Sequence, residues 1–152
     1  MIRRWNAVVA DPKPGPVTLA GMTPLDAVLD HVGTEEIDID GRVAFLVSCL
    51  GHRLLRWGTH LVTGRRIAML VDPAGTKLEL LEVDELRGDL DHVAYRVADV
   101  DAAHAALLAA GCTERRRPGD LPAERARSSM LQEPSGARLQ LIAYSPGSPD
   151  LV

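Results

Sequence analysis

Apolar and polar positions in the first half of the chain predict a strand, a helix and three further strands. Between Asp38, a favourable N-cap, and Gly51, a residue suited to ending a helix, apolar residues recur with helical spacing. The sequence Asp-Pro-Ala-Gly at 72–75 predicts a turn. The strands are predicted over 28–36, 53–62, 66–71 and 77–83.

The second half repeats this order of elements. A strand is predicted over 90–97, and a helix over 102–110 follows it, capped by Asp99 or Asp101 and ended by Gly111. The three remaining strands are predicted within 115–125, over 126–131 and over 138–144. The pattern therefore predicts two tandem units, each with the order strand, helix, strand, strand, strand.

An internal repeat of sequence matches the repeat of elements. Leu29-Asp30-His31-Val32 recurs as Leu90-Asp91-His92-Val93, and the strand that carries Glu79 recurs as the strand that carries Gln140. The offset is 61 positions in both cases, from 31 to 92 and from 79 to 140. The two halves therefore hold two histidines, a glutamate and a glutamine at equivalent positions.

Alternation along the strands places these four polar side chains on one face. Glu79 and Gln140 each lie between two leucines, and His31 and His92 each precede a valine. The apolar neighbours should face the helices, and the polar residues the opposite side. If the two halves of the sheet curve toward each other, all four side chains converge in one trough.

Composition limits the domain organisation and the class of partner. The 152 residues suffice for one domain with a sizeable core. We expect this domain over 28–144, made of modules 28–83 and 90–144. We also expect an irregular arm over 1–27 before it and a tail over 145–152 after it. A net charge of −4 and 3% aromatic residues disfavour nucleic-acid binding. No apolar run is long enough to span a membrane, and two cysteines make no disulfide framework. We therefore expect a cytoplasmic protein with buried thiols.

At four motifs the chain resembles the vicinal oxygen chelate superfamily, which includes glyoxalase I, methylmalonyl-CoA epimerase, extradiol dioxygenases, fosfomycin-resistance enzymes and bleomycin-binding proteins. The motifs are Asp30-His31-Val32-Gly33, Phe45 through Leu50-Gly51, Asp72-Pro73-x-Gly75-x-x-x-Glu79-Leu80 and Asp91-His92-Val93-Ala94. The resemblance implies an α+β fold in which two tandem βαβββ modules form a partly open, mostly antiparallel β-barrel with flanking helices. It also implies a homodimer, and leaves open whether the modules pair within one chain or between two.

The resemblance further implies a divalent metal ion, Zn, Ni, Co, Fe or Mn, and places its ligands on His31, Glu79, His92 and Gln140. These ions accept imidazole nitrogen and carboxylate oxygen. The set looks like that of methylmalonyl-CoA epimerase, although there the glutamine typically belongs to the first module and the glutamate to the second. Many glyoxalase I proteins instead carry glutamate in both modules, so Gln140 departs from their pattern.

This metal site points to a metal-dependent isomerase or lyase of the glyoxalase I or methylmalonyl-CoA epimerase type. The substrate would be a small molecule with vicinal oxygens, and a proton would be transferred next to a metal-bound carbonyl. Glu79 is the only acid among the four ligands and is the candidate base, with Glu35 as an alternative. Two other functions stay open: an Fe(II) dioxygenase of the same superfamily, and a non-catalytic drug-binding or resistance protein.

For the remaining residues with reactive or charged side chains, a structural or solvent-exposed role is favoured. His52, His60 and His104 lack partners in the repeat, so we expect them at the surface or in loops. The arginines at 115–117 could hold a carboxylate or phosphate of a substrate such as a CoA ester, but a solvated loop is the favoured explanation. Cys49 is expected to be a small buried apolar residue.

Overall fold

A computed structural model describes residues 21, 23–88 and 90–152. Most of the predicted arm over 1–27 therefore lies outside the described residues. The first module contains β1 (Val28–Glu36), α1 (Ile39–Leu50), β2 (Arg53–Thr59), β3 (Arg66–Val71) and β4 (Lys77–Glu82). The second contains β5 (Leu90–Arg96), α2 (Val100–Ala109), β6 (Thr113–Leu121), β7 (Ala126–Gln132) and β8 (Arg138–Tyr144).

The local signals act where the sequence predicts them. The Asp38 carboxylate accepts a hydrogen bond from the Gly41 N–H at 2.9 Å and caps α1, which ends at Gly51 with a φ of 70°. Asp99 rather than Asp101 caps α2. The predicted strand over 53–62 is too long, because the chain turns after Thr59.

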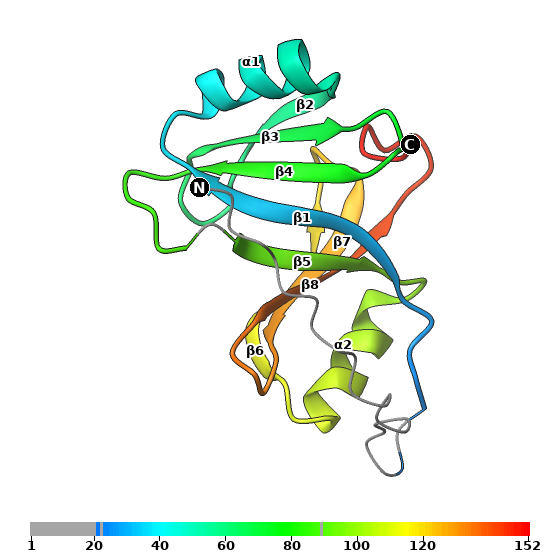
Figure 1. Ribbon diagram of the computed structural model, residues 1–152. Helices are drawn as coiled ribbons and strands as arrows, with labels where there is room; N and C mark the ends of the chain where they lie inside the picture. The colour runs from blue at the N-terminus through cyan, green and yellow to red at the C-terminus, as the bar shows by residue number, and fades with distance from the viewer. Residues whose placement is uncertain (1–20, 22, 89) are drawn as a thin grey trace, which may run out of the picture.

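All eight strands form one curled sheet in the order β2-β3-β4-β1-β5-β8-β7-β6 (Figure 1). Five of the seven strand pairings are antiparallel, and the parallel ones are β1–β4 and β5–β8. The two modules meet where β1 pairs antiparallel with β5. The prediction of an α+β fold with two βαβββ modules is confirmed, and within this chain the modules pair with each other.

The helices cover the convex side of the sheet, one helix over each module (Figure 1). The α1 side of the core contains Ile39, Leu46, Ala68, Leu70 and Leu80. The α2 side contains Val97, Val100, Ala103, Leu131, Leu139 and Leu141. Apolar side chains of the central strands pack into these two cores. The residues between them along each strand therefore face the concave side, as the alternation predicts.

Two smaller features concern the ends and the thiols. The segment after β8 folds back onto the sheet, where Asp150 is fully buried. Cys49 is exposed and Cys112 only partly buried, so the prediction of buried thiols is wrong, because Cys49 lies on the outer face of α1. No helix of the described ranges is long and apolar enough to cross a membrane.

The α1 core gives a direct test of this packing. Leu70 on β3 is fully buried beneath α1. We expect Leu70→Ala to lower the free energy of unfolding by about 2–5 kcal/mol, through lost apolar burial and the cavity left behind. Val47 on the same helix is 42% exposed, and Val47→Ala should stay within about 0.5 kcal/mol of the parent. Urea denaturation followed by circular dichroism measures both, and equal losses would contradict this core.

Candidate metal centre

The four predicted ligands lie on the four central strands and face the same cavity. His31 is on β1, Glu79 on β4, His92 on β5 and Gln140 on β8. The strand register explains this convergence, since β1 and β5 are neighbours and β4 and β8 flank them. All four side chains are buried.

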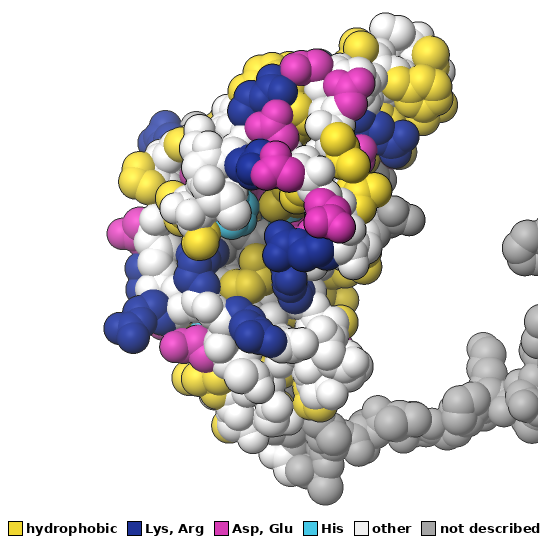
Figure 2. Space-filling model, turned by 90° about the vertical axis from the view of Figure 1, so that its left-hand side faces the viewer, with side chains coloured by type: hydrophobic (Ala, Val, Ile, Leu, Met, Phe, Trp, Pro, Cys, Tyr) yellow, Lys and Arg dark blue, Asp and Glu magenta, His cyan; other side chains and the backbone are white. Residues whose placement is uncertain are grey.

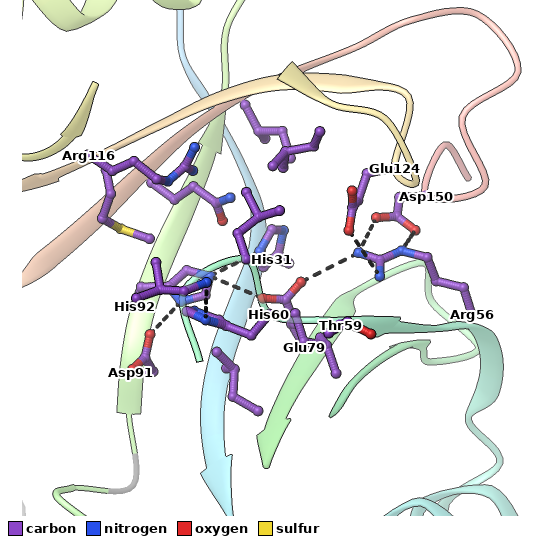
Figure 3. Close-up of a pocket in the computed structure, with 18 residues that line it drawn as sticks. His31, Arg56, Thr59, His60, Glu79, Asp91, His92, Arg116, Glu124 and Asp150 are labelled. Carbon is purple, nitrogen blue, oxygen red and sulfur yellow. Dashed lines mark hydrogen bonds and ion pairs between the residues drawn. The ribbon is translucent and has the colours of Figure 1, made fainter. Parts of the chain in front are cut away.

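Three of the four bring their donor atoms to one point (Figure 3). The Nε2 atoms of His31 and His92 are 3.1 Å apart, and the Glu79 Oε1 atom lies 3.7 Å from His92 Nε2. One ligand atom from each of these residues lies within 4.8 Å of the other two. Two imidazoles and a carboxylate at this separation form a group that could hold a divalent cation.

Two β-bulges set the direction of the histidines. In the β1–β5 ladder, Leu29 pairs with Tyr95 and His31 with Ala94, so the residue between them, Asp30, has no partner on β5. The same interruption occurs on β5. There Gly33 pairs with His92 and Thr34 with Leu90, so Asp91 has no partner on β1. A bulged residue departs from strict alternation. Each aspartate can therefore turn back toward the histidine that follows it.

Each aspartate holds its neighbouring imidazole by the Nδ1 atom. His31 Nδ1 lies 2.7 Å from Asp30 Oδ2, and His92 Nδ1 lies 2.9 Å from Asp91 Oδ2. An ionised carboxylate only accepts hydrogen bonds, so Nδ1 is the donor in both pairs. In the neutral imidazole this leaves a lone pair on Nε2. Carboxylate–histidine pairs of this kind orient the histidine ligands of metal sites.

A positive charge at its centre would stabilise this donor set. Two Nε2 lone pairs and the Glu79 carboxylate point at one another over the distances given above. Without a cation between them these groups repel, and either a divalent ion or an extra proton on an imidazole would relieve the repulsion. The residues present fit a divalent metal ion.

Gln140 adds an oxygen that lacks a partner. Its Nε2 atom donates to the Ser128 hydroxyl at 2.9 Å, whereas its Oε1 atom is buried without a hydrogen-bond partner in the described structure. A buried acceptor of this kind is costly unless a donor or a cation satisfies it. The orphaned oxygen lines the same cavity as the three other predicted ligands, which is consistent with a fourth ligand position.

Asp30 belongs to a buried network that also includes Lys77 and Tyr144. Lys77 Nζ lies 3.0 Å from Asp30 Oδ1, and the Tyr144 hydroxyl donates to Asp30 Oδ2 at 2.7 Å. Burial acts to raise the pKa of Asp30, but the hydrogen bonds from His31 and Tyr144 and the charge of Lys77 outweigh it and lower the pKa to about 2. Asp30 therefore stays ionised and accepts the hydrogen bond from His31 Nδ1.

Arg56 connects Glu79 to the C-terminal segment. Its guanidinium makes two hydrogen bonds to the Asp150 carboxylate, at 2.7 and 2.9 Å. It also lies 3.6 Å from Glu79 Oε2 and 3.5 Å from Glu124 Oε1 (Figure 3). Burial acts to lower the pKa of Arg56, but the hydrogen bonds and charge of Asp150 outweigh it and raise the pKa. One Glu79 oxygen thus faces the histidines while the other faces a fixed cation.

Other residues of the cavity were not predicted from the sequence. Arg56, Glu124 and Asp150 come from β2, the β6–β7 turn and the C-terminal segment. Arg56 corresponds to Arg116 of the second module, since Arg56 pairs with Met69 and Met69 with Glu79, as Arg116 pairs with Met130 and Met130 with Gln140. The offset between the two arginines is 60 positions, so the repeat of 61 positions did not single them out. Glu124 and Asp150 lie in a turn and near the chain end, where no pattern in the sequence pointed to them. Glu35, the alternative base, is buried, but it accepts a hydrogen bond from the Arg87 N–H and does not line the cavity of the four predicted ligands.

The unpaired histidines depart in part from the prediction. His104 is not at the surface: it is buried on α2, where it lies within hydrogen-bond distance of the Ser129 hydroxyl and the Glu114 carboxylate. It is an example of a histidine satisfied within the core. His60 is in the connection after β2, as expected, but it lines the central cavity and its Nδ1 atom accepts from two backbone N–H groups. Burial lowers the pKa of His60.

The cavity has an inner and an outer part. The inner part, about 80 Å³, contains the donor set, and the outer part, about 530 Å³, adjoins it through His60, Asp91 and Arg116. Arginines at 66, 87, 115, 116 and 138 line the outer part. Figure 2 shows Lys and Arg side chains around a hollow in this face, with a histidine visible between them. A small chemical group could enter the inner part, and the rest of a larger ligand would extend into the outer part.

Comparison with known proteins agrees with the fold. The family model of the Glyoxalase/Bleomycin resistance protein/Dioxygenase superfamily matches residues 28–141. The chain belongs to this superfamily, and the resemblance stated from its motifs is confirmed. Divalent metal ions are common in this superfamily, and the His31–Glu79–His92 cluster is where this chain could hold one. No curated protein sequence matches the chain.

Solved structures share the fold at low sequence identity. A hypothetical protein from Bacillus halodurans C-125 is 20% identical with a TM-score of 0.68, over 81% of this chain and 98% of its own. A Streptomyces coelicolor methylmalonyl-CoA epimerase variant, in complex with 2-nitronate-propionyl-CoA, is 23% identical with a TM-score of 0.65, over 77% and 96%. The epimerase from Mycobacterium tuberculosis is 25% identical with a TM-score of 0.64, over 78% and 88%.

Gly33 provides a steric test of the site. A Cβ atom at Gly33 would lie 2.4 Å from Cε1 of the His92 ring, so Gly33→Ala must displace the imidazole. Displacing one ligand should weaken binding of Zn²⁺ or Co²⁺ by at least about tenfold. Gly88→Ala is the matched control, because no atom lies closer than 4.0 Å to its added Cβ. Competition with a chromogenic chelator measures both affinities, and unchanged affinity in Gly33→Ala would contradict His92 as a ligand.

The Asp91–His92 pair provides an electrostatic test. Asp91 holds His92 Nδ1 and accepts a hydrogen bond from Arg138 at 2.9 Å. Asp91→Asn removes the charge behind the imidazole with little change in volume, and should lower metal affinity by about 10–100-fold. Asp101→Asn removes an exposed carboxylate on α2 that pairs with Arg127 and does not line the cavity, and it should leave metal affinity unchanged. The same chelator competition reads out both variants.

Proposed function

We propose that this protein is a metal-dependent isomerase or lyase that transfers a proton next to a carbonyl group. The observation that carries the proposal is the arrangement of His31 and His92, whose Nδ1 atoms are held by aspartates and whose Nε2 atoms face each other at 3.1 Å beside Glu79. The metal would be held by His31, Glu79, His92 and Gln140. Bound there, a divalent ion supplies Lewis acidity to a carbonyl oxygen and favours loss of a proton from the adjacent carbon.

The protein side chains would orient the substrate and move the proton. Glu79 is proposed as ligand and base, since its Oε1 faces the histidines while Oε2 faces Arg56. Arg56 would hold the carboxylate in place. Glu124 is a second candidate for the proton acceptor. It is buried, lines the same cavity and is not among the four proposed ligands.

Similar structures support this reaction class over the alternatives. Methylmalonyl-CoA epimerases are among the solved structures that share the fold, and such structures are in complex with 2-nitronate-propionyl-CoA or with methylmalonyl-CoA. An acyl-CoA ester or another small carbonyl compound with vicinal oxygens is therefore the proposed substrate class. The small inner cavity favours a reacting group over a bulky sequestered drug.

An Fe(II) dioxygenase is the second candidate, because two histidines and one carboxylate also form the ligand set of non-haem Fe(II) oxygenases. The two functions differ in their need for oxygen. A homodimer remains a prediction from the family resemblance. All four proposed ligands come from one chain, so the site needs no second copy to supply them.

Glu79→Gln and Glu124→Gln test the proposal and its base. The assay is deuterium exchange at the carbon next to the carbonyl, followed by NMR with methylmalonyl-CoA and with the hemithioacetal of methylglyoxal and glutathione. It is run without oxygen, with Zn²⁺, Ni²⁺ or Co²⁺. Glu79→Gln should lose both metal, measured by elemental analysis, and exchange, by at least about 100-fold. Glu124→Gln should keep the metal, and exchange falls only if Glu124 is the acceptor.

Glu85→Gln, an exposed glutamate in the connection after β4, is the control and should change neither quantity. Retention of metal in Glu79→Gln would contradict the proposed site. A protein that holds metal but turns over substrate only with Fe(II) and oxygen would support the dioxygenase instead. Tight binding of a bulky ligand by metal-free protein would support a binding protein.

A further inference from the structure

Arg116 is a cation in the cavity wall that no carboxylate neutralises. It lies on β6, partly buried, and lines both the inner and the outer cavity. Its hydrogen bonds go to the hydroxyl and the carbonyl oxygen of Ser128, at 2.9 and 3.3 Å. Both acceptors are neutral. Among the described residues, no carboxylate oxygen lies within 4.0 Å of this guanidinium.

Four of the other arginines around the cavity differ from Arg116 in this respect, and the fifth, Arg115, is exposed to solvent and donates to the neutral Gln132 side chain. Arg56, Arg66, Arg87 and Arg138 each have at least one carboxylate within 4.0 Å. Burial lowers the pKa of Arg116, and the charge of Glu124, which is nearer to Arg56, offsets this only in part. Holding a charge away from water without a partner is costly. An anion that enters the cavity would remove this cost.

The position of Arg116 relates it directly to the proposed metal site. Ser128 Oγ accepts from Arg116 Nη2 and from Gln140 Nε2, both at 2.9 Å. Across the sheet, Arg116 pairs with Met130, which in turn pairs with Gln140. The guanidinium is therefore one shared hydroxyl away from the amide whose Oε1 atom lacks a partner. A molecule at the donor set would lie within the same small cavity as Arg116.

We propose that Arg116 binds a carboxylate group of the substrate, whose reacting carbonyl lies at the His31–Glu79–His92 cluster. The inference rests on the proposed function, because it names the substrate class of the same site: a small acid that carries a carbonyl group. Ser128 uses only two of the five guanidinium N–H groups, so donors remain for a carboxylate. Arg116 is the one unpaired arginine among the described residues that line the inner part, and its single charge suits a carboxylate better than a doubly charged phosphate.

The first experiment needs no metal and no variant. The side-chain Nε–Hε NMR signals of the EDTA-treated protein are followed during titration with propionate, with propionamide as the neutral analogue and with inorganic phosphate. The Arg116 signal should shift saturably with propionate and not with propionamide, while the signal of exposed Arg117 stays fixed. An unmoved Arg116 signal, equal shifts of both arginines, or tighter binding of phosphate would overturn the proposal.

The second experiment uses Zn²⁺-loaded protein and calorimetry. Oxaloacetate, 2-oxoglutarate and 2-oxoadipate place a second carboxylate at increasing distance from a 2-oxo acid group, and 2-oxobutyrate lacks it. At least one of the three should bind tenfold or more tightly than 2-oxobutyrate. Arg116→Gln should abolish that advantage, Arg116→Lys should keep part of it, and Arg117→Gln should keep all of it. No advantage in the parent protein, or an advantage that survives Arg116→Gln, would overturn the proposal.

The two experiments separate this inference from the proposed function. If Glu79→Gln keeps its metal while the Arg116 signal still responds to propionate, the metal site fails and the carboxylate site stands. If metal and proton exchange depend on Glu79 but neither experiment shows a carboxylate at Arg116, the proposed function stands and this inference fails.

Discussion

The antiparallel pairing of β1 with β5 is the interaction on which the site depends. It joins the two modules into one sheet and brings two histidines, 61 positions apart in the chain, to an Nε2–Nε2 distance of 3.1 Å. A bulge at Asp30 and another at Asp91 let each aspartate hold the next imidazole by Nδ1. The two Asp–His pairs are therefore related by the same approximate two-fold symmetry that relates β1 to β5.

The charged partners of the two aspartates differ between the two modules. In the first module, Asp30 is buried with Lys77 and Tyr144, and Lys77 also donates to the backbone carbonyl of Asp150. In the second, Asp91 pairs with the partly exposed Arg138. The C-terminal segment thus supports one half of the site through contacts that have no equivalent in the other. Among the described residues, Arg116 is the partly buried arginine of the inner cavity without a carboxylate within 4.0 Å.

Much of the fold and the proposed ligand set could be predicted because both depend on local or repeated signals. Period-two alternation, capping aspartates and turn sequences define the elements, and the repeat relates His31 to His92 and Glu79 to Gln140. Contacts between distant segments could not be predicted. Glu124 and Asp150 reach the cavity from a turn and from the chain end, and the burial of His104 depends on how α2 packs against β6 and β7.

The sequence by itself determined which strands exist, which of their faces are polar and which side chains are related by the duplication, because these follow from local spacing and chain chemistry. The tertiary structure alone decided that both modules of one chain pair with each other, which arginines find a carboxylate and that Gln140 keeps a free oxygen. Those outcomes depend on distances across the sheet, and a one-dimensional pattern does not contain the curvature that sets them.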